Sequence, residues 1–163
     1  MSIGTIWRYG DDINTDVIFP GKYTYQPLTP EEMAGHAMED LDPSFAGQVK
    51  EGDVIVAGEN FGCGSSREQA ATCLKAAGIA AVVAKSFSRI FFRNAINNGL
   101  PVIELSEGIE AMKKGNTLSV DFEEGVVAYE GHEYHFPALP NEVIAIIEDG
   151  GLISHVRKEL GKG

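Results

Sequence analysis

Residues 54–68 read VIVAGENFGCGSSRE, four apolar residues followed by a glycine-rich loop that ends in two serines, an arginine and a glutamate. A short apolar run of this kind is typical of a strand that is buried on both faces. Residues 68–77 are mostly good helix formers, and Gly78 suits the C-cap of a helix. The stretch therefore predicts a strand, a loop and a helix in succession, as in α/β proteins with a parallel sheet.

The same alternation of strand and helix continues after this helix. Residues 79–84 and 101–104 form two further apolar runs, and the helix between them should begin at Ser86 or Ser88 and end at about Asn97. Strands joined by helices predict right-handed crossovers and a mainly parallel core sheet. The last third of the chain differs, because strand-like runs separated by Glu-Gly turns predict an antiparallel meander at 117–122, 125–129 and 132–136.

The remaining segments complete a single expected domain over residues 1–163. Residues 3–9 form a candidate strand, and residues 29–38 begin with Thr-Pro-Glu-Glu, a strong signal for the start of a helix. Residues 140–150 have an early proline and a late glycine, which again favours a helix. Residues 158–163 are predicted to be a frayed tail.

The composition is that of a soluble globular protein with a large acidic excess. The chain has 24 acidic and 13 basic residues and a formal net charge of −11. This charge argues against nucleic acid or an anionic membrane as a partner. An anion site in such a chain needs clustered cations, and the candidates are Lys22, Arg67, Lys85, Arg89 and Arg93.

The cysteines and histidines predict no metal site in this chain. Cys63 and Cys73 do not have CxxC spacing and are too few for zinc or an iron–sulfur cluster. None of the four histidines shares a metal-ligand spacing with a cysteine or carboxylate. The N-terminus lacks the features of a signal peptide, and no apolar stretch approaches the length of a membrane span. We therefore expect a cytoplasmic protein.

The loop itself favours binding of a small carboxylate. Ser65 and Ser66 should lie near the start of the following helix, where free N–H groups and the helix dipole favour an anion. Arg67 adds a guanidinium, which can grip a carboxylate with two parallel hydrogen bonds. Two other interpretations stay open: Ser65 and Glu68 have the spacing of a capping box, and a phosphate could bind, although no lysine occupies the Walker A position.

Two other segments are candidates for site support. Residues 14–16, Asn-Thr-Asp, can form a turn that caps its own backbone or can orient an active-site group. Arg89 and Arg93 lie at i and i+4 on one expected helix face, either as an exposed pair or as a basic rim near the anion site.

Three separated motifs resemble one enzyme family. They are DINTDVIFP at 12–20, GDVIVAGENFGCGSSRE at 52–68 and AKSFSRIFFRNAINNGLP at 84–101. In this order, and over nearly the whole chain, they resemble the small subunit of 3-isopropylmalate dehydratase, the detached swivel domain of the aconitase superfamily. The resemblance implies a three-layer β/β/α fold. It also implies a hydro-lyase reaction in which dehydration and rehydration move a hydroxyl between adjacent carbons.

The resemblance also implies partners and residue roles. A [4Fe–4S] cluster with one open iron would act as the Lewis acid, and its cysteines would belong to a large subunit, so that this chain binds no cofactor. Ser65 matches the serine base, Arg67 the arginine that binds the substrate carboxylate, and Asp16 a supporting active-site aspartate. The implied substrate-binding positions are Gly64, Ser66, Arg89 and the loop residues Lys22, Tyr23, Thr24 and Tyr25.

One departure from the family pattern leaves the substrate open. The loop that reads the substrate's side group is GKYTYQP at 21–27 and has no arginine, which a third carboxylate would require. An isopropyl group against the tyrosines is the leading expectation, for an enzyme of leucine biosynthesis. The alternatives are a hydratase of 2,3-dimethylmalate, citraconate/methylmalate or homoaconitate, and a non-catalytic module that binds carboxylates.

Overall fold

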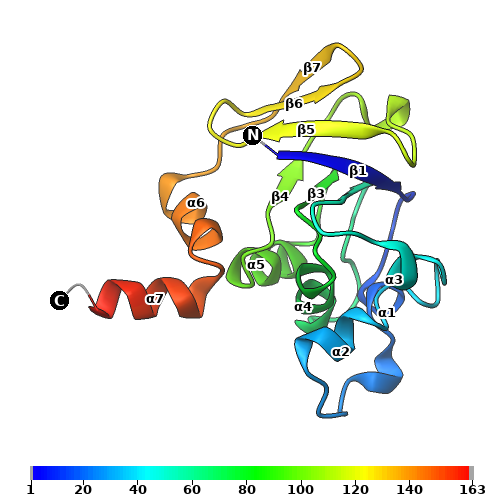
Figure 1. Ribbon diagram of the computed structural model, residues 1–163, viewed down its shortest axis with the longest axis vertical. Coiled ribbons are helices and arrows are strands. Elements are labelled where there is room, and N and C mark those ends of the chain that lie inside the picture. The colour runs from blue at the N-terminus through cyan, green and yellow to red at the C-terminus, as the bar shows by residue number, and fades with distance from the viewer. Residues whose placement is uncertain (1, 162–163) are drawn as a thin grey trace.

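A seven-stranded mixed sheet organises the chain in the computed structural model, which describes residues 2–161 (Figure 1). The strand order is β4-β3-β2-β1-β5-β6-β7. The parallel half consists of β1 (Ser2–Arg8), β2 (Val54–Ala57), β3 (Ala81–Ala84) and β4 (Val102–Glu104). The antiparallel half adds β5 (Thr117–Asp121), β6 (Val126–Tyr129) and β7 (His132–His135), which confirms the predicted meander.

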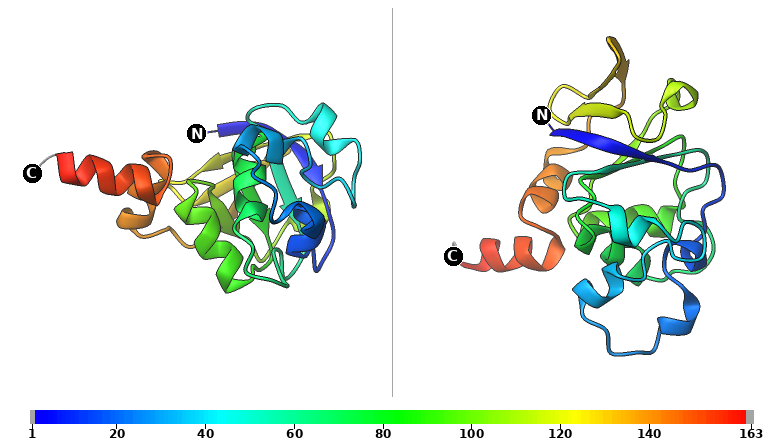
Figure 2. Two further views of the ribbon diagram at one scale, coloured as in Figure 1. Left: turned by 90° about the horizontal axis from the view of Figure 1, so that it is seen from below. Right: turned by 45° about the vertical axis from the view of Figure 1, so that its right-hand side comes forward.

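Strand β1 connects the two halves because its two ends have different partners. Its second part pairs parallel with β2, with Ile6 opposite Val54. Its first part pairs antiparallel with β5, with Thr5 opposite Thr117. The antiparallel half consequently turns over one face of the parallel half, as Figures 1 and 2 show.

The two faces of the parallel half support two separate cores. Val54 and Val56 of β2 belong to a core shared with the meander, whereas Ile55 and Ala57 belong to a core shared with the helices. All four side chains are buried, as expected for a strand that is covered on both sides. The layers are therefore meander, parallel sheet and helices, which confirms the expected β/β/α arrangement.

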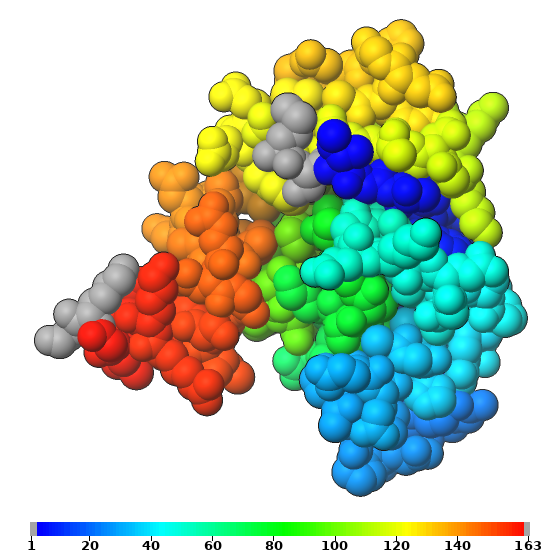
Figure 3. Space-filling model, viewed as in Figure 1, coloured from blue at the N-terminus to red at the C-terminus, as the bar shows by residue number. Residues whose placement is uncertain are grey.

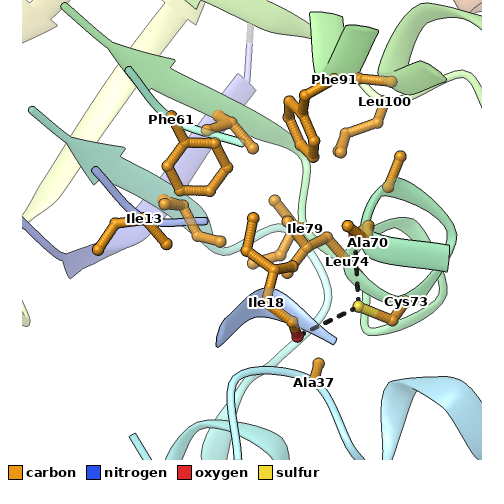
Figure 4. Packing of buried hydrophobic residues seen from close by; sticks show 14 of the residues in the cluster. Ile13, Ile18, Ala37, Phe61, Ala70, Cys73, Leu74, Ile79, Phe91 and Leu100 are labelled. Atoms are coloured by element: carbon orange, nitrogen blue, oxygen red, sulfur yellow. Dashed lines mark hydrogen bonds between the residues drawn. The ribbon is translucent and has the colours of Figure 1, made fainter. Parts of the chain in front are cut away.

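The helical layer packs on the second core. The helices are α1 (Thr15–Ile18), α2 (Pro30–Ala34), α3 (Phe45–Gln48), α4 (Gln69–Ala76), α5 (Arg89–Asn97), α6 (Asn141–Glu148) and α7 (Leu152–Gly161). Figure 4 shows Leu74 of α4 and Phe91 of α5 pointing into this core toward Phe61. The buried thiol of Cys73 donates to the carbonyl oxygens of Ala70 at 3.3 Å and Ile18 at 3.7 Å. This core holds α1 and α4 together.

The C-terminal segment differs from the expected frayed tail. Residues 158–161 belong to α7, whereas 162–163 lie outside the described residues. His155 and Lys158 of α7 both contact the carboxylate of Asp149, at 2.7 and 2.9 Å, which ties the helix to the end of α6. The helix nevertheless projects from the rest of the molecule (Figures 2 and 3). Within residues 2–161, no helix combines the length and apolarity needed to cross a membrane.

Candidate active site

Two loops meet at the carboxyl ends of β1 and β2, where open α/β sheets commonly place ligand sites. Asn14 and Cys63 form an isolated parallel bridge between these loops. The Gly62 N–H donates to the Ile13 carbonyl at 2.7 Å, and the Thr15 N–H donates to the Cys63 carbonyl at 2.8 Å. These bonds bring the Asn-Thr-Asp segment alongside the Gly/Ser loop, although about fifty residues separate them in the chain.

Two glycines give the Gly/Ser loop its path. Gly62 and Gly64 have φ angles of +81° and +98°, a region that favours glycine. A Cβ on Gly62 would lie only 2.2 Å from Cγ of Phe91, so the loop backbone rests directly on α5. A Cβ on Gly64 would find ordinary contacts, 3.5 Å from the nearest atoms of Asn14 and Thr15. Position 62 therefore requires glycine because of both its close packing and its backbone angle, whereas position 64 favours glycine only because of its backbone angle.

Ser65 is exposed and makes its side-chain contact with a buried threonine. The Oγ atoms of Ser65 and Thr15 lie 3.0 Å apart, and the Thr15 hydroxyl also lies 3.2 Å from the Ser65 carbonyl oxygen. Thr15 is only 1% exposed and is the first residue of α1. Because burial and its backbone bond to Cys63 restrict Thr15, it can orient the Ser65 hydroxyl. Thr15 could not be identified from the sequence, because a threonine between Asn and Asp carries no distinctive signal.

Arg67 is fixed at the same place by two acceptors. Its Nη1 forms an ion pair with Asp16 and lies 3.3 Å from the carbonyl oxygen of Phe19. The Arg67 side chain is 16% exposed and that of Asp16 is 65% exposed, so the pair lies at the surface with the guanidinium partly covered. A Cβ on Gly21 would lie 3.1 Å from Oδ1 of Asp16 and 3.5 Å from the other terminal nitrogen of Arg67, so a larger residue there would crowd the ion pair. An arginine held in this way retains donors for a carboxylate.

The serines do not cap the following helix, contrary to one sequence interpretation. Helix α4 begins at Gln69 after Glu68 as N-cap, and no side-chain cap bond is formed. The capping box of Ser65 with Glu68 is therefore wrong, and so is the expectation that the serines lie at the helix start. The Ser66 carbonyl accepts a hydrogen bond from Asn94 of α5 at 3.3 Å, while its side chain is exposed. The serine hydroxyls are thus free of a capping role.

Asn14 has the local role that an Asx residue commonly takes. Its Oδ1 accepts the N–H of Val17 at 2.9 Å and caps α1. The structural interpretation of the Asn-Thr-Asp turn is therefore confirmed for Asn14, while Thr15 and Asp16 both face the Gly/Ser loop. One short segment serves both purposes.

The predicted substrate loop starts with a 3₁₀ turn, η1 (Gly21–Tyr23). Tyr23 stacks on His36 with ring centroids 3.9 Å apart. The Lys22 ammonium lies 3.9 Å from Oε1 of Glu39 and 5.2 Å from the centre of the Tyr23 ring. The lysine charge is thus partly balanced within the loop region.

The second part of this loop holds Thr24, whose hydroxyl is buried, and Tyr25, which is exposed. The Thr24 hydroxyl is buried without a hydrogen-bond partner among the described residues, while its carbonyl accepts from Gln69 of α4 at 3.2 Å. Tyr25 is 97% exposed. The roles of residues 22–25 in substrate binding stay predictions.

Arg89 lies apart from this cluster. It is the first residue of α5 and is exposed, and with Arg93 it lines a groove of about 540 Å³. Within residues 2–161, no hydrogen bond or ion pair links Arg89 to the Ser65, Arg67 and Asp16 cluster. Its predicted role in binding substrate has no geometric support from that cluster.

The two cysteines do not fit an iron–sulfur cluster. Cys73 is fully buried, and burial raises the pKa of its thiol. Burial, together with the charge of Asp12, also raises the pKa of the Cys63 thiol. An iron–sulfur cluster is usually held by three or four cysteines, and this chain has two, of which Cys73 is enclosed in the core. Over residues 2–161, no group of three His, Cys, Asp or Glu side chains is arranged to hold a metal ion.

Known proteins with a similar sequence match the chain over the same two loops. Residues 10–108 match the aconitase C-terminal domain, a range that contains both loops of the site. The chain belongs to this family. It is 52% identical to 3-isopropylmalate dehydratase small subunit 1 of Archaeoglobus fulgidus, covering 95% of this chain and 96% of that protein. It is 48% identical to the 3-isopropylmalate dehydratase small subunit of Heliobacterium modesticaldum, covering 98% and 97% of the two chains.

Two further relatives bear on the fold and on the substrate. The crystal structure of 3-isopropylmalate dehydratase from Methanocaldococcus jannaschii has a TM-score of 0.90 and 41% identity, and the match covers 99% of this chain and 98% of that one. The methanogen homoaconitase small subunit of Methanothermobacter thermautotrophicus is 46% identical, covering 98% of this chain and 93% of that protein. The resemblance seen in the sequence is confirmed, and this aconitase family member has relatives that are named for two substrates.

Proposed function

We propose that this chain is the small subunit of a hydro-lyase that interconverts 2-isopropylmalate and 3-isopropylmalate in leucine biosynthesis. Its large subunit would carry a [4Fe–4S] cluster, and the complex would work in the cytoplasm. The observation that carries the proposal is the contact of an exposed Ser65 with buried Thr15, beside the ion pair of Arg67 and Asp16. The names of the similar proteins support the same reaction class.

Ser65 is the proposed base. As an alkoxide, its Oγ takes the proton from the carbon next to a substrate carboxylate, so that the C–H bond breaks and a serine O–H forms. The electron pair of the C–H bond becomes the second bond of the alkene as hydroxide leaves the neighbouring carbon. Rehydration with the two carbons exchanged gives the isomer. A serine hydroxyl is a poor base on its own, so it requires donors that stabilise the alkoxide.

The neighbours of Ser65 can stabilise the alkoxide and bind the substrate carboxylate. The Thr15 hydroxyl, 3.0 Å away, can accept the proton of the neutral serine while its own proton is donated to the Ser65 carbonyl at 3.2 Å, and it can turn this proton to the alkoxide once Ser65 is ionised. Arg67 binds the substrate carboxylate through donors that its bonds to Asp16 and Phe19 leave available, and its charge favours the alkoxide. Ser66 lies next in the loop and helps to hold the same carboxylate. No residue of this chain is assigned to departure of the hydroxide, which we leave to the large subunit.

The openness of the site supports a two-subunit enzyme. Gly64, Ser65 and Ser66 are all exposed, so this chain alone does not enclose a substrate at the Gly/Ser loop. Catalysis of this type requires exclusion of water and a complete set of charged groups. A large subunit that covers the Gly/Ser loop would satisfy both conditions.

The loop that follows Pro20 favours isopropylmalate over homoaconitate. Residues 21–27 contain no arginine, and the ammonium of Lys22 is directed toward Glu39. A third carboxylate would therefore meet only one cation in this loop, Lys22, whose charge is already partly balanced by Glu39. Tyr23 and Tyr25 offer aromatic surface instead, which suits an apolar substituent.

Reconstitution tests this proposal. The chain would be co-purified anaerobically with candidate large subunits and assayed for hydration of cis-unsaturated acids, including the isopropyl, dimethyl, methyl and homoaconitate series. We expect turnover only in the complex and the highest kcat/KM for the isopropyl compounds. A chain that binds dicarboxylates tightly alone and gives no turnover with any large subunit would instead be a binding module.

A further inference from the structure

Two arginines of α5 have no acidic partner in the described structure. Arg89 and Arg93 are exposed, and neither takes part in an ion pair or hydrogen bond within residues 2–161. The chain has 24 acidic residues and a net charge of −11, so carboxylates are abundant elsewhere on the protein. The two arginines thus form a small basic area on an acidic protein.

These arginines border a groove with an apolar floor. Phe87, Phe92 and Ile96 line it together with Arg89, Arg93 and one acidic side chain, Glu104. In a helix with 3.6 residues per turn, positions 89, 92, 93 and 96 lie on one face. Ile96 is only 7% exposed and Phe92 packs on the helical core, so these two side chains form the floor of the groove and the exposed arginines form its border. A second hollow, near residues 136–139, also contains Phe92 and Glu104, so the groove continues along the end of β4.

Helix α5 lies between the groove and the catalytic loop, because Phe91 and Asn94 face the loop from the side of the helix away from the groove. The same helix carries Phe91, which packs beneath Gly62, and Asn94, whose side chain donates to the Ser66 carbonyl at 3.3 Å. A partner that covers Ser65 must therefore border this helix. The arginines themselves do not contact the Ser65 cluster, which makes them poor candidates for holding the reacting carboxylate.

We propose that this groove docks an acidic segment of the large subunit. Carboxylates of that segment pair with Arg89 and Arg93, and an apolar side chain packs on Phe92 and Ile96. The inference rests on the proposed function, because it requires a large subunit. The positive charge of Arg89 and Arg93 favours an acidic segment as the occupant, and a second copy of this chain is disfavoured because two chains with net charge −11 repel each other. Paired arginines at an interface favour both association rate and orientation.

A charge-reversal experiment tests the docking surface. The variant Arg89→Glu/Arg93→Glu would be compared with Lys113→Glu/Arg157→Glu, which makes the same change in net charge at exposed positions away from the groove. The dissociation constant for the wild-type large subunit would be measured by interferometry at low and high salt. We expect the groove variant to bind about 10- to 100-fold more weakly and to lose salt dependence, while the control stays within about threefold.

Other outcomes separate this inference from the proposed function. Circular dichroism and the milder variant Arg89→Gln/Arg93→Gln, with an intermediate loss of affinity, guard against misfolding. An unchanged dissociation constant would overturn the docking surface. If the KM for isopropylmalate rose while that dissociation constant stayed unchanged, Arg89 would be assigned to substrate binding. A groove variant that only lost self-association in sedimentation would assign the groove to a second copy. Failure of the wild-type chains to form a complex would overturn both proposals.

Discussion

Replacement of Thr15 by valine isolates the contact that distinguishes Ser65 from an ordinary surface serine. Valine has nearly the same shape, so the buried space stays filled while the hydroxyl 3.0 Å from the Ser65 Oγ is removed. A hydrogen bond to a charged group is worth about 1.5–3 kcal/mol, and each 1.4 kcal/mol is tenfold in rate. If Thr15 donates to the Ser65 alkoxide, kcat of the reconstituted enzyme should fall about 10- to 150-fold.

The pH dependence gives this prediction a direction. Loss of a donor to the alkoxide raises the pKa of the base, so the acidic limb of the kcat profile should move to higher pH. Stability should change by only about 1 kcal/mol, because the exposed Ser65 groups can bond to water instead. Thr15→Ser keeps the hydroxyl and serves as the control. A valine variant with unchanged kcat and an unchanged pH profile would refute the role of Thr15.

Three further predictions concern packing, binding and the C-terminal helix. Gly62→Ala should lower the free energy of unfolding in urea by about 2–5 kcal/mol, because position 62 has a positive φ and a Cβ there would overlap an aromatic ring of α5. Gly64→Ala has only the positive φ and should lower it by about 1–2 kcal/mol. Equal losses would contradict the packing of the loop on α5. Arg67→Lys should raise KM about tenfold or more, because a point charge cannot both keep its acidic partner and grip a carboxylate in a bidentate manner; an unchanged KM would count against carboxylate binding. Hydrogen bonds from His155 and a nearby lysine lower the pKa of Asp149 below its ordinary value of 3.8. The stability that the charged carboxylate gives to α7 is therefore fully present above pH 3.8 and is lost as the pH falls through the lower pKa of the folded state. Asp149→Asn should therefore speed amide exchange in α7 at pH 7, and unaltered exchange would show that the helix is held by other contacts.

The layered core could be predicted from the sequence because its signals are local. The apolar runs at 54–57 and 79–84 alternate with segments of good helix formers, and turn residues separate the last three strands. The strand at 54–57 has the predicted bounds, and the one at 79–84 begins two residues late, at Ala81. Burial on both faces explains why these runs show no alternation.

The active-site contacts could not be predicted because they join distant segments. Nothing in the local pattern of residues 14–16 indicates that Thr15 meets Ser65, since that contact depends on the bridge between Asn14 and Cys63. The start of α4 was predicted within one residue, but the capping box of Ser65 with Glu68 was wrong, because the loop that carries Ser65 packs on α5 and does not cap the helix. These contacts are set by tertiary structure and not by propensity.

Helix α7 was missed for a different reason. Its apolar residues Leu152, Ile153, Val156 and Leu160 are exposed, so its pattern does not describe a buried face. The glycine at 150 suits the end of the preceding helix, and no element was predicted for residues 151–157. Its side-chain hydrogen bonds to the end of α6 are those of His155 and Lys158 with Asp149.

The most direct test of the account is the turnover of a complex in which Ser65 is replaced by alanine. General-base catalysis contributes about 10²- to 10⁴-fold, so Ser65→Ala should lower kcat for isopropylmalate isomerisation by at least about 10²-fold while the affinity for the large subunit stays unchanged. Exchange of the substrate's proton with deuterated solvent should fall by the same factor. Near-normal turnover and exchange in that complex would contradict the assignment of Ser65 as the base.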